Sequence, residues 1–300
     1  MMEIEIQQGT AIIFANKDYA RKLLRKNDWY TSLLSEFDLQ SKIQTTSNAV
    51  KIKDYLEISQ MYLLDWTEEE IELLTNIVNK TKLKIEELML SFKLPKEIFL
   101  IKSTMQEEGD AEGFTRNNYI VLNYKDISDD LFQHELFHII SRYNPKIKNK
   151  LFSSIGFRRC NEIRIPEELA HLKITNPDAP YNNYFIKVVY KGNIEDAFMF
   201  IYAIEKYKGG SFFDYMITQL ILIEGSSKDK RIKRNENGEF ISLDYDEVDN
   251  LFEQIGTNTE YNIHPEEICA EHFTLLLQGL SGLPNQELIT KMKSILNESQ

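Results

Sequence analysis

The apolar residues between positions 128 and 144 recur at the three- and four-residue spacing of one face of an α-helix. They are Leu131, Phe132, Leu136, Ile139, Ile140 and Tyr143. Ser128 is a favourable N-cap, and Asn144-Pro145 ends the pattern because the residue before a proline avoids the helical conformation. The pattern therefore predicts a largely buried helix between Ser128 and Asn144.

A second apolar helix is predicted near the end of the sequence. Pro265 suits its first turn, and Glu266 and Glu267 suit the positively polarised end of the helix dipole. Its apolar body consists of Ile268, Phe273, Leu275, Leu276 and Leu277. Both predicted helices carry side chains of the types that bind metal ions.

Elsewhere in the chain, the pattern predicts mainly helices up to about residue 95 and both strands and helices after it. A capping box at Thr67 to Glu70 opens a long helix toward Ser91. Two short β runs follow, at 98–101 and 119–122, and residues 185–190 alternate like a strand. This order of elements predicts an α+β fold.

The same pattern suggests how the chain is divided. Residues 1–95 read as a mainly helical N-terminal region, and residues 96–300 read as a second domain that contains both apolar helices. The stretch between these helices is long enough to form an insertion, which we expect around 160–245.

Composition narrows the class of protein. The chain has 300 residues, 42% of them hydrophobic, and a net charge of −12, which argues against a nucleic-acid surface because phosphates require clustered Lys and Arg. No stretch approaches the roughly 20 continuous apolar residues of a membrane span. Residues 1–8 lack the pattern of a secretory signal, and Cys160 and Cys269 are isolated. We expect a cytoplasmic protein that does not enter a membrane, and the oligomeric state stays open.

The first apolar helix contains the motif HExxH. It reads His134-Glu135-Leu136-Phe137-His138. Two histidines four residues apart point from one helical face toward one metal ion, and Glu135 between them reaches a water bound to that metal. Because a buried helix offers two histidines few other polar partners, a metal site is favoured over a pair of histidines hydrogen-bonded in the core.

A catalytic zinc needs three protein ligands and one open position. A metzincin would continue the motif with a glycine and a third His, but Ser141 and Asn144 stand at those positions. A peptide deformylase would supply a Cys upstream of the motif, whereas both cysteines follow it. The third ligand is therefore sought in the second apolar helix.

Several side chains of that second helix are candidates. Glu267 and Glu271 lie on nearly the same helical face, and His264 and His272 are further candidates, although His272 is expected to be exposed. Glu266 faces about 100° away from Glu267, so the two cannot bind one metal from a regular helix.

The sequence from Glu267 to Glu271 resembles the second zinc-binding helix of the gluzincins, a group of HExxH zinc metallopeptidases in the zincin superfamily. The resemblance implies a zincin-like fold and one Zn²⁺ per chain. It implies that the ligands are His134, His138 and Glu267, that Glu135 is the general base, and that Glu271 accepts a histidine N–H. The family usually has the shorter Asp where Glu271 stands.

The resemblance also suggests where a substrate would lie. Zincins bind an extended substrate backbone on an edge strand, which suggests the run from 118 to 123, with Tyr119, Ile120, Val121 and Leu122; an ordinary core strand is the alternative. A hydrogen-bond donor must also stabilise the tetrahedral intermediate. Tyr261 and His264 are the nearest candidates in sequence, and each can equally be structural.

These observations predict zinc-dependent hydrolysis of peptide bonds in a peptide or protein substrate. The alternative is a protein whose zinc site only stabilises the fold while its cleft binds a peptide or protein partner. Glu135 favours the enzyme, because a structural site has no need of a base between its histidines.

Overall fold

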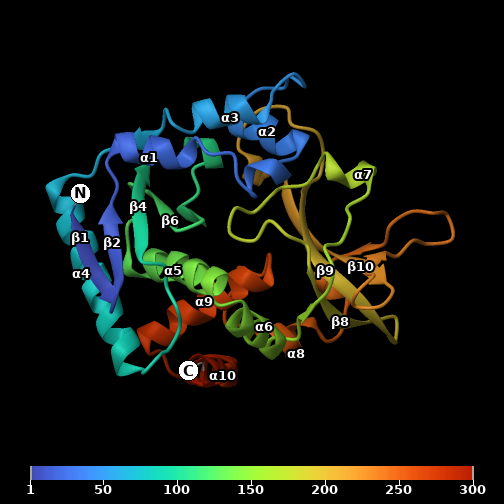
Figure 1. Cartoon of the computed structure of the whole chain (residues 1–300). Helices are drawn as coiled ribbons and strands as arrows, with labels where there is room; N and C mark the ends of the chain where they lie inside the picture. Colours follow the sequence, from blue (N-terminus) through green and yellow to red (C-terminus); the bar gives the residue numbers. More distant parts are fainter. Residues whose placement is uncertain (1, 299–300) are drawn as a thin grey trace.

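The chain has an α+β fold with two β-sheets (Figure 1). The computed structural model describes residues 2–298. Its helices are α1 (Lys17–Leu24), α2 (Glu36–Ile43), α3 (Ile52–Ile58), α4 (Glu68–Glu87), α5 (Asp129–Tyr143), α6 (Pro145–Ser154), α7 (Glu167–Ala170), α8 (Leu251–Ile255), α9 (Pro265–Gln278) and α10 (Gln286–Asn297). Its strands are β1 (Glu3–Gln7), β2 (Thr10–Phe14), β3 (Leu63–Leu64), β4 (Glu97–Ser103), β5 (Gly113–Arg116), β6 (Tyr119–Asn123), β7 (Arg158–Arg159), β8 (Tyr184–Tyr190), β9 (Asn193–Ala203), β10 (Met216–Glu224), β11 (Arg231–Ile232) and β12 (Ser242–Leu243).

The first sheet joins the beginning of the chain to its middle. Its order is β1-β2-β4-β6-β5, with β3 paired to β4, and the pairs β2/β4 and β4/β6 are parallel. Because β2 pairs with β4, the sheet joins strands from both sides of the boundary expected at residue 95. β1 and β2 have five residues each and meet at a turn in which Gly9 has φ +80°, so their alternating pattern is too short to stand out in the sequence.

Helix α5 lies between this sheet and α9. It contacts β5 and β6 on one side and α9 on another, and Figure 1 shows α5 and α9 crossing in the middle of the molecule. Phe132, Leu136 and Ile140 are fully buried in the core that α5 shares with α4 and α9. The helix predicted between Ser128 and Asn144 is confirmed, as is the capping box at Thr67.

The edge of the first sheet nearest to α5 is β5 and not β6. β6 pairs with β4 on one side and with β5 on the other, and all five of its residues are buried. The expectation that Tyr119, Ile120, Val121 and Leu122 line a substrate groove is therefore wrong, and the alternative of a core strand holds. β5 has only four residues and follows a polar connection, so it is too short to be predicted as a strand from its own pattern.

The second sheet is formed by the stretch between α6 and α9. Its order is β11-β10-β9-β8-β7, with β12 paired to β10, and its pairs are antiparallel. These strands occupy most of the insertion expected around 160–245 and lie at the right of Figure 1. None of the helices between residues 2 and 298 combines the length and the apolar character of a membrane-spanning segment.

Candidate metal centre

Two helices position the polar residues at the centre of the molecule. The Ser128 side chain accepts from the N–H of Leu131 and so caps α5. His264 caps α9 by accepting from the N–H of Glu266 through Nδ1, at 3.0 Å, and Pro265 occupies the first turn. Both ends are thus fixed by local sequence, which sets the register of the side chains that face each other across the helix pair.

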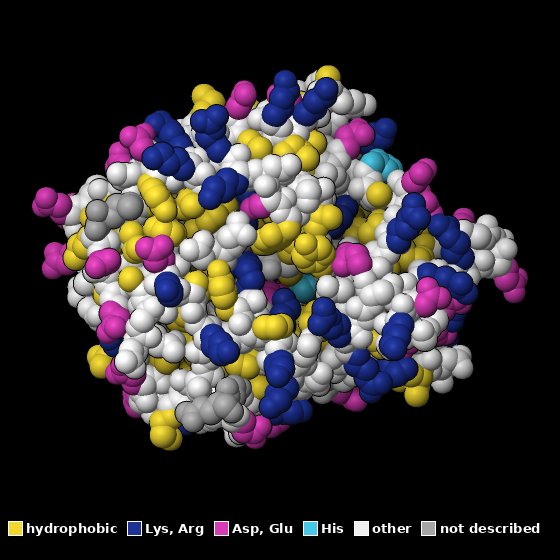
Figure 2. All heavy atoms as spheres, viewed as in Figure 1, with side chains coloured by type: hydrophobic (Ala, Val, Ile, Leu, Met, Phe, Trp, Pro, Cys, Tyr) yellow, Lys and Arg dark blue, Asp and Glu magenta, His cyan; other side chains and the backbone are white. Residues whose placement is uncertain are grey.

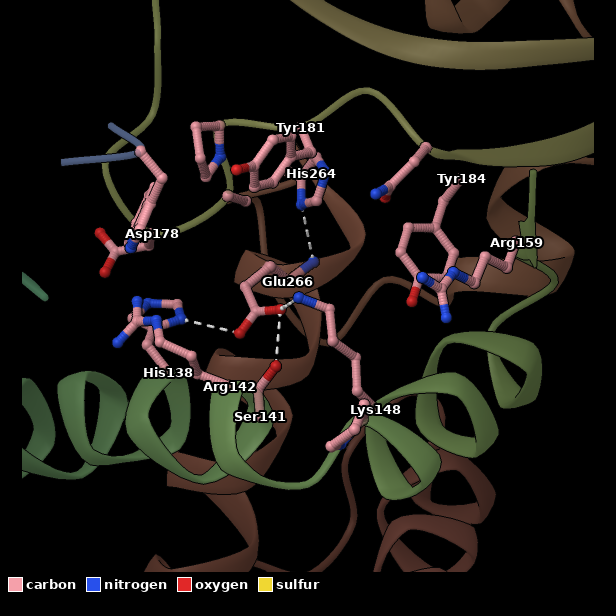
Figure 3. A pocket seen from close by; sticks show the side chains of 15 residues that line it. His138, Ser141, Arg142, Lys148, Arg159, Asp178, Tyr181, Tyr184, His264 and Glu266 are labelled. Carbon is pink, nitrogen blue, oxygen red and sulfur yellow. Dashed lines mark hydrogen bonds and ion pairs between the residues drawn. The ribbon is translucent and has the colours of Figure 1, made fainter. Parts of the chain in front are cut away.

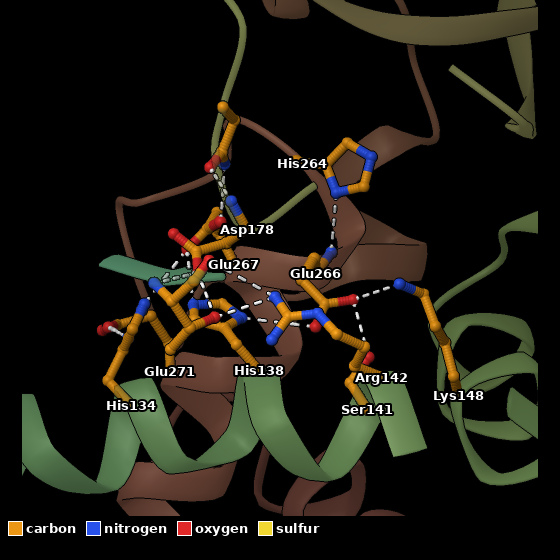
Figure 4. A network of polar contacts seen from close by, with 12 residues as sticks. His134, His138, Ser141, Arg142, Lys148, Asp178, His264, Glu266, Glu267 and Glu271 are labelled. Atoms are coloured by element: carbon orange, nitrogen blue, oxygen red, sulfur yellow. Dashed lines mark hydrogen bonds and ion pairs between the residues drawn. The ribbon is translucent and has the colours of Figure 1, made fainter. Parts of the chain in front are cut away.

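His134, His138 and Glu267 converge between α5 and α9 (Figure 4). Glu267 Oε2 lies 3.0 Å from His134 Nε2 and 3.4 Å from His138 Nε2. Ligand atoms that surround one tetrahedral Zn²⁺ at its usual bond lengths are about 3.4 Å apart. The two histidine nitrogens therefore face the same carboxylate oxygen, at separations close to those between ligand atoms of one metal ion.

The second nitrogen of each histidine contacts another carboxylate. His134 Nδ1 lies 2.8 Å from Glu271 Oε1, and His138 Nδ1 lies 3.3 Å from Glu266 Oε1. A carboxylate at Nδ1 accepts the proton there, so the Nε2 lone pair of the same ring is free to bind a metal. Both rings are oriented in this way by α9.

Glu266 belongs to the cluster as well, through contacts that the sequence did not predict. Glu266 faces about 100° away from Glu267 on α9, so the two cannot bind one metal ion. Glu266 instead contacts Nδ1 of His138, on the other side of the ring from Nε2. Glu266 Oε2 also accepts from Ser141 Oγ at 2.8 Å and pairs with Lys148 Nζ at 2.6 Å. Burial raises the pKa of Glu266, but Lys148 and His138 outweigh burial and lower that pKa to about 2. The carboxylate therefore stays ionised.

The proton affinity of the histidines also reflects these contacts. Burial lowers the pKa of His134, but hydrogen bonds to Glu267 and Glu271 outweigh it and raise that pKa to about 10. Burial likewise lowers the pKa of His138, whereas Asp178 and Glu267 raise it above its ordinary value. A bound cation would displace these protons, because metal ligands must be deprotonated.

Glu135 points from α5 toward β5. The residue is only 3% exposed, and its Oε2 has no hydrogen-bond partner within residues 2–298. A Cβ on Gly113 would lie 2.9 Å from Glu135 Oε1, so the glycine allows the carboxylate to approach the edge strand. Burial is the main cause that raises the pKa of Glu135, to about 8. A buried carboxylate of this kind is suited to accept a proton.

Two residues of the loop between α7 and β8 complete the cluster, and no local sequence pattern predicts either of them. Asn176 Nδ2 donates to Glu267 Oε1 at 2.7 Å, which leaves Glu267 Oε2 to face the histidines. Asp178 accepts from Thr115 on β5, and one of its carboxylate oxygens lies within 4.8 Å of ligand atoms of His138 and Glu267. Burial raises the pKa of Asp178.

Tyr261 is the other predicted residue that reaches the cluster. Its ring centroid lies 6.2 Å from that of His134, and it lines a cavity together with Glu135 and Glu267. Although the side chain is open to this cavity, burial among protein atoms and the Glu267 carboxylate raise the pKa of Tyr261 well above 10. The phenol therefore keeps its proton and can donate a hydrogen bond.

The structure gives the two remaining histidine candidates other surroundings. His264 is committed to capping α9, and burial lowers its pKa to about 4, so it is neutral. His272 is 1% exposed, and the prediction that it is exposed is wrong, because α9 is covered on most sides by α4, α5, α6 and α10. The structure brings neither ring into the group formed by His134, His138 and Glu267.

Two cavities flank the cluster. The larger, of about 740 Å³, is lined by His134, Glu135 and Tyr261, and by the acids Asp110, Glu112 and Asp130. The smaller, of about 340 Å³, is lined by His138, with Arg142, Lys148 and Arg159 around it (Figure 3). Asp178 lines both cavities, so its loop lies between them. The face of the molecule in Figure 2 is hollowed near its centre, where a histidine is visible among lysine and arginine side chains.

The residues present fit a divalent cation. His138 Nε2 and Glu135 Oε2 are buried without hydrogen-bond partners in the described part of the chain, and both face the point where the donors converge. Two histidines and a carboxylate suit Zn²⁺, whereas Mg²⁺ and Ca²⁺ prefer oxygen ligands alone. Comparisons with family models, with curated proteins and with solved structures found no match to this chain.

Proposed function

We propose that the protein is a zinc-dependent hydrolase of peptide bonds, in which His134, His138 and Glu267 hold the metal. The observation that carries the proposal is the pairing of a three-donor site with Glu135, which borders the same cavity and whose buried Oε2 has no hydrogen-bond partner among the described residues. Bound at this site, Zn²⁺ would act as a Lewis acid and lower the pKa of water toward neutrality.

The chain's own residues would supply the proton transfers. Glu135 takes a proton from the attacking water and later delivers it to the leaving amine of the cleaved amide. Tyr261 keeps its phenolic proton and lies on the wall of the same cavity, so it can donate a hydrogen bond to the oxyanion of the tetrahedral intermediate. Glu271 and Glu266 hold the histidine rings in the orientation described above.

Strand β5 offers a place for an extended substrate backbone. It is the edge strand of the first sheet, and Gly113 borders Glu135. Thr115 directs its N–H away from β6, and alternation along the strand gives Gly113 the same orientation. A peptide that adds to this edge as an antiparallel strand would pass beside Glu135, which favours peptides over compact small molecules.

We also propose an architecture and a location for the protein. The contact of an HExxH helix with an edge strand, and the second helix that carries Glu267 and Glu271, support a gluzincin-type, zincin-like architecture. Cys160 and Cys269 are both free, which supports a cytoplasmic location.

The competing proposal is a structural zinc site with a cleft that binds a peptide or protein partner. A purely structural site has no use for a base beside its metal. The isolation of Glu135 Oε2 therefore favours hydrolysis.

Metal removal tests the proposal directly. We expect the purified protein to cleave members of a broad peptide library, and a zinc chelator to abolish this cleavage because the ligands then hold protons in place of the metal. Re-added Zn²⁺ should restore cleavage at the same peptide positions. Cleavage that persists in the fully metal-free protein would contradict a zinc-dependent mechanism.

A further inference from the structure

The loop that carries Asp178 lies over the centre of the proposed site. Asn176 and Asp178 both belong to the sequence Asn176-Pro177-Asp178-Ala179-Pro180, in which two prolines restrict the backbone. The base of the loop is held on α2, because Thr175 donates to Asp38 through its N–H at 3.0 Å and through Oγ1 at 2.7 Å. The loop is thus ordered by contacts outside the metal centre.

One end of the Asp178 carboxylate caps the edge strand. Asp178 Oδ1 accepts from the N–H of Thr115 at 2.8 Å and from Thr115 Oγ1 at 2.6 Å. Arg142 in turn donates to Thr115 Oγ1 at 2.8 Å. The outward-facing N–H of Thr115 is one that a substrate strand on β5 would use, so Asp178 stands where that strand would pair.

The same carboxylate faces the metal ligands. A ligand oxygen of Asp178 lies within 4.8 Å of ligand atoms of both His138 and Glu267, so these three residues form a group that could hold a metal ion. Asn176 ties the loop to this group, because its side chain donates to Glu267 at 2.7 Å and accepts from the N–H of Asp178 at 2.8 Å. In Figure 4 the Asp178 side chain points toward Glu267 and His138.

We propose that Asp178 is a fourth protein ligand of the metal, and that the structure shows a closed form in which this ligand and the cap on Thr115 together exclude a peptide. This inference rests on the proposed metal centre. A catalytic zinc requires one open position, so Asp178 must withdraw before water and substrate can enter. Withdrawal also frees the N–H of Thr115, so substrate pairing and opening of the site are coupled through one side chain.

The test separates ligation from charge. Asp178→Asn keeps the shape of the side chain and an oxygen for Thr115, but an amide is a weaker ligand than a carboxylate. We expect zinc affinity, measured by competition with a chromophoric chelator, to fall by about tenfold or more. Asp110→Asn is the matched control, because Asp110 lines the larger cavity and its change removes the same charge. The control should keep the zinc affinity of the wild type.

A second variant tests closure. Asp178→Ala removes both the ligand and the cap, so at saturating Zn²⁺ we expect a lower KM for peptides that span β5 and a kcat at least equal to that of the wild type. Equal zinc affinity in Asp178→Asn and Asp110→Asn would overturn the ligand assignment. A higher KM or a lower kcat in zinc-loaded Asp178→Ala would overturn closure and assign Asp178 to the reaction itself.

The zinc measurement also distinguishes this inference from the proposed hydrolysis. Protein that binds zinc and shows the loss in Asp178→Asn, but cleaves no peptide in any variant, would support the ligand role and contradict the hydrolase. Protein that cleaves peptides with zinc, and whose zinc affinity is unchanged in Asp178→Asn, would support the hydrolase and contradict the ligand role of Asp178. Absence of zinc binding in all variants would overturn both.

Discussion

Glu135→Gln is expected to lower peptide hydrolysis by about 10²- to 10⁴-fold while zinc content and melting temperature stay at the wild-type values. Gln keeps the size and hydrogen-bonding reach of the side chain but cannot accept the proton of water. The measurement compares cleavage of a peptide library, zinc stoichiometry and thermal unfolding for the two proteins. Glu112→Gln is the control, because Glu112 lines the same cavity and is exposed.

Two outcomes of this comparison would contradict the role of Glu135. Equal cleavage by wild type and Glu135→Gln would point to a contaminating protease and remove the support for catalysis at this site. Loss of zinc in Glu135→Gln would show that Glu135 helps to hold the metal or the fold and is not a base alone.

The second large effect is expected at the carboxylates of α9. Glu267→Ala should nearly abolish zinc binding, because Glu267 Oε2 faces both histidines. Glu271→Ala and Glu266→Ala should weaken zinc binding by roughly 10- to 100-fold, because each removes the partner of one histidine Nδ1. Competition with a chromophoric chelator measures all three affinities.

The order of severity decides the ligand assignment. A greater loss in Glu271→Ala than in Glu267→Ala would mean that the ligand lies one helical turn further along α9. Glu266→Ala also leaves Lys148 without its buried partner, so its melting temperature is measured beside its affinity. Glu266→Gln, which keeps an acceptor for Ser141, separates the loss of charge from the loss of packing.

Local signals in the sequence were sufficient to predict the two helices of the site. Ser128 and Pro265 mark the beginnings of α5 and α9, and the apolar spacing within each helix defines which face is buried. The four-residue separation of His134 and His138 then fixes that both point to one side of α5. These features depend on residues within a few turns of each other, which is the range over which periodicity and capping act.

The contacts that the sequence did not reveal join residues far apart in the chain. Asp178 and Thr115 are 63 residues apart, and Asn176 and Glu267 are 91 apart. No local pattern relates such pairs, because their proximity depends on how the second sheet and its loops pack against β5 and α9. The four residues of β5 were missed for the same reason, since pairing with β6 defines that strand more than its own composition does.

The number of zinc ions per chain, measured by elemental analysis of purified protein, tests most directly whether His134, His138 and Glu267 form a zinc site. We expect one zinc in the wild type and none in His134→Ala or His138→Ala, both with lower melting temperatures because metal-binding energy is also folding energy. His171→Ala, which changes a histidine that contacts the backbone of Glu167 on α7, should keep its zinc. Wild-type protein that holds no transition metal after zinc supplementation, or full zinc occupancy in His138→Ala, would contradict the account.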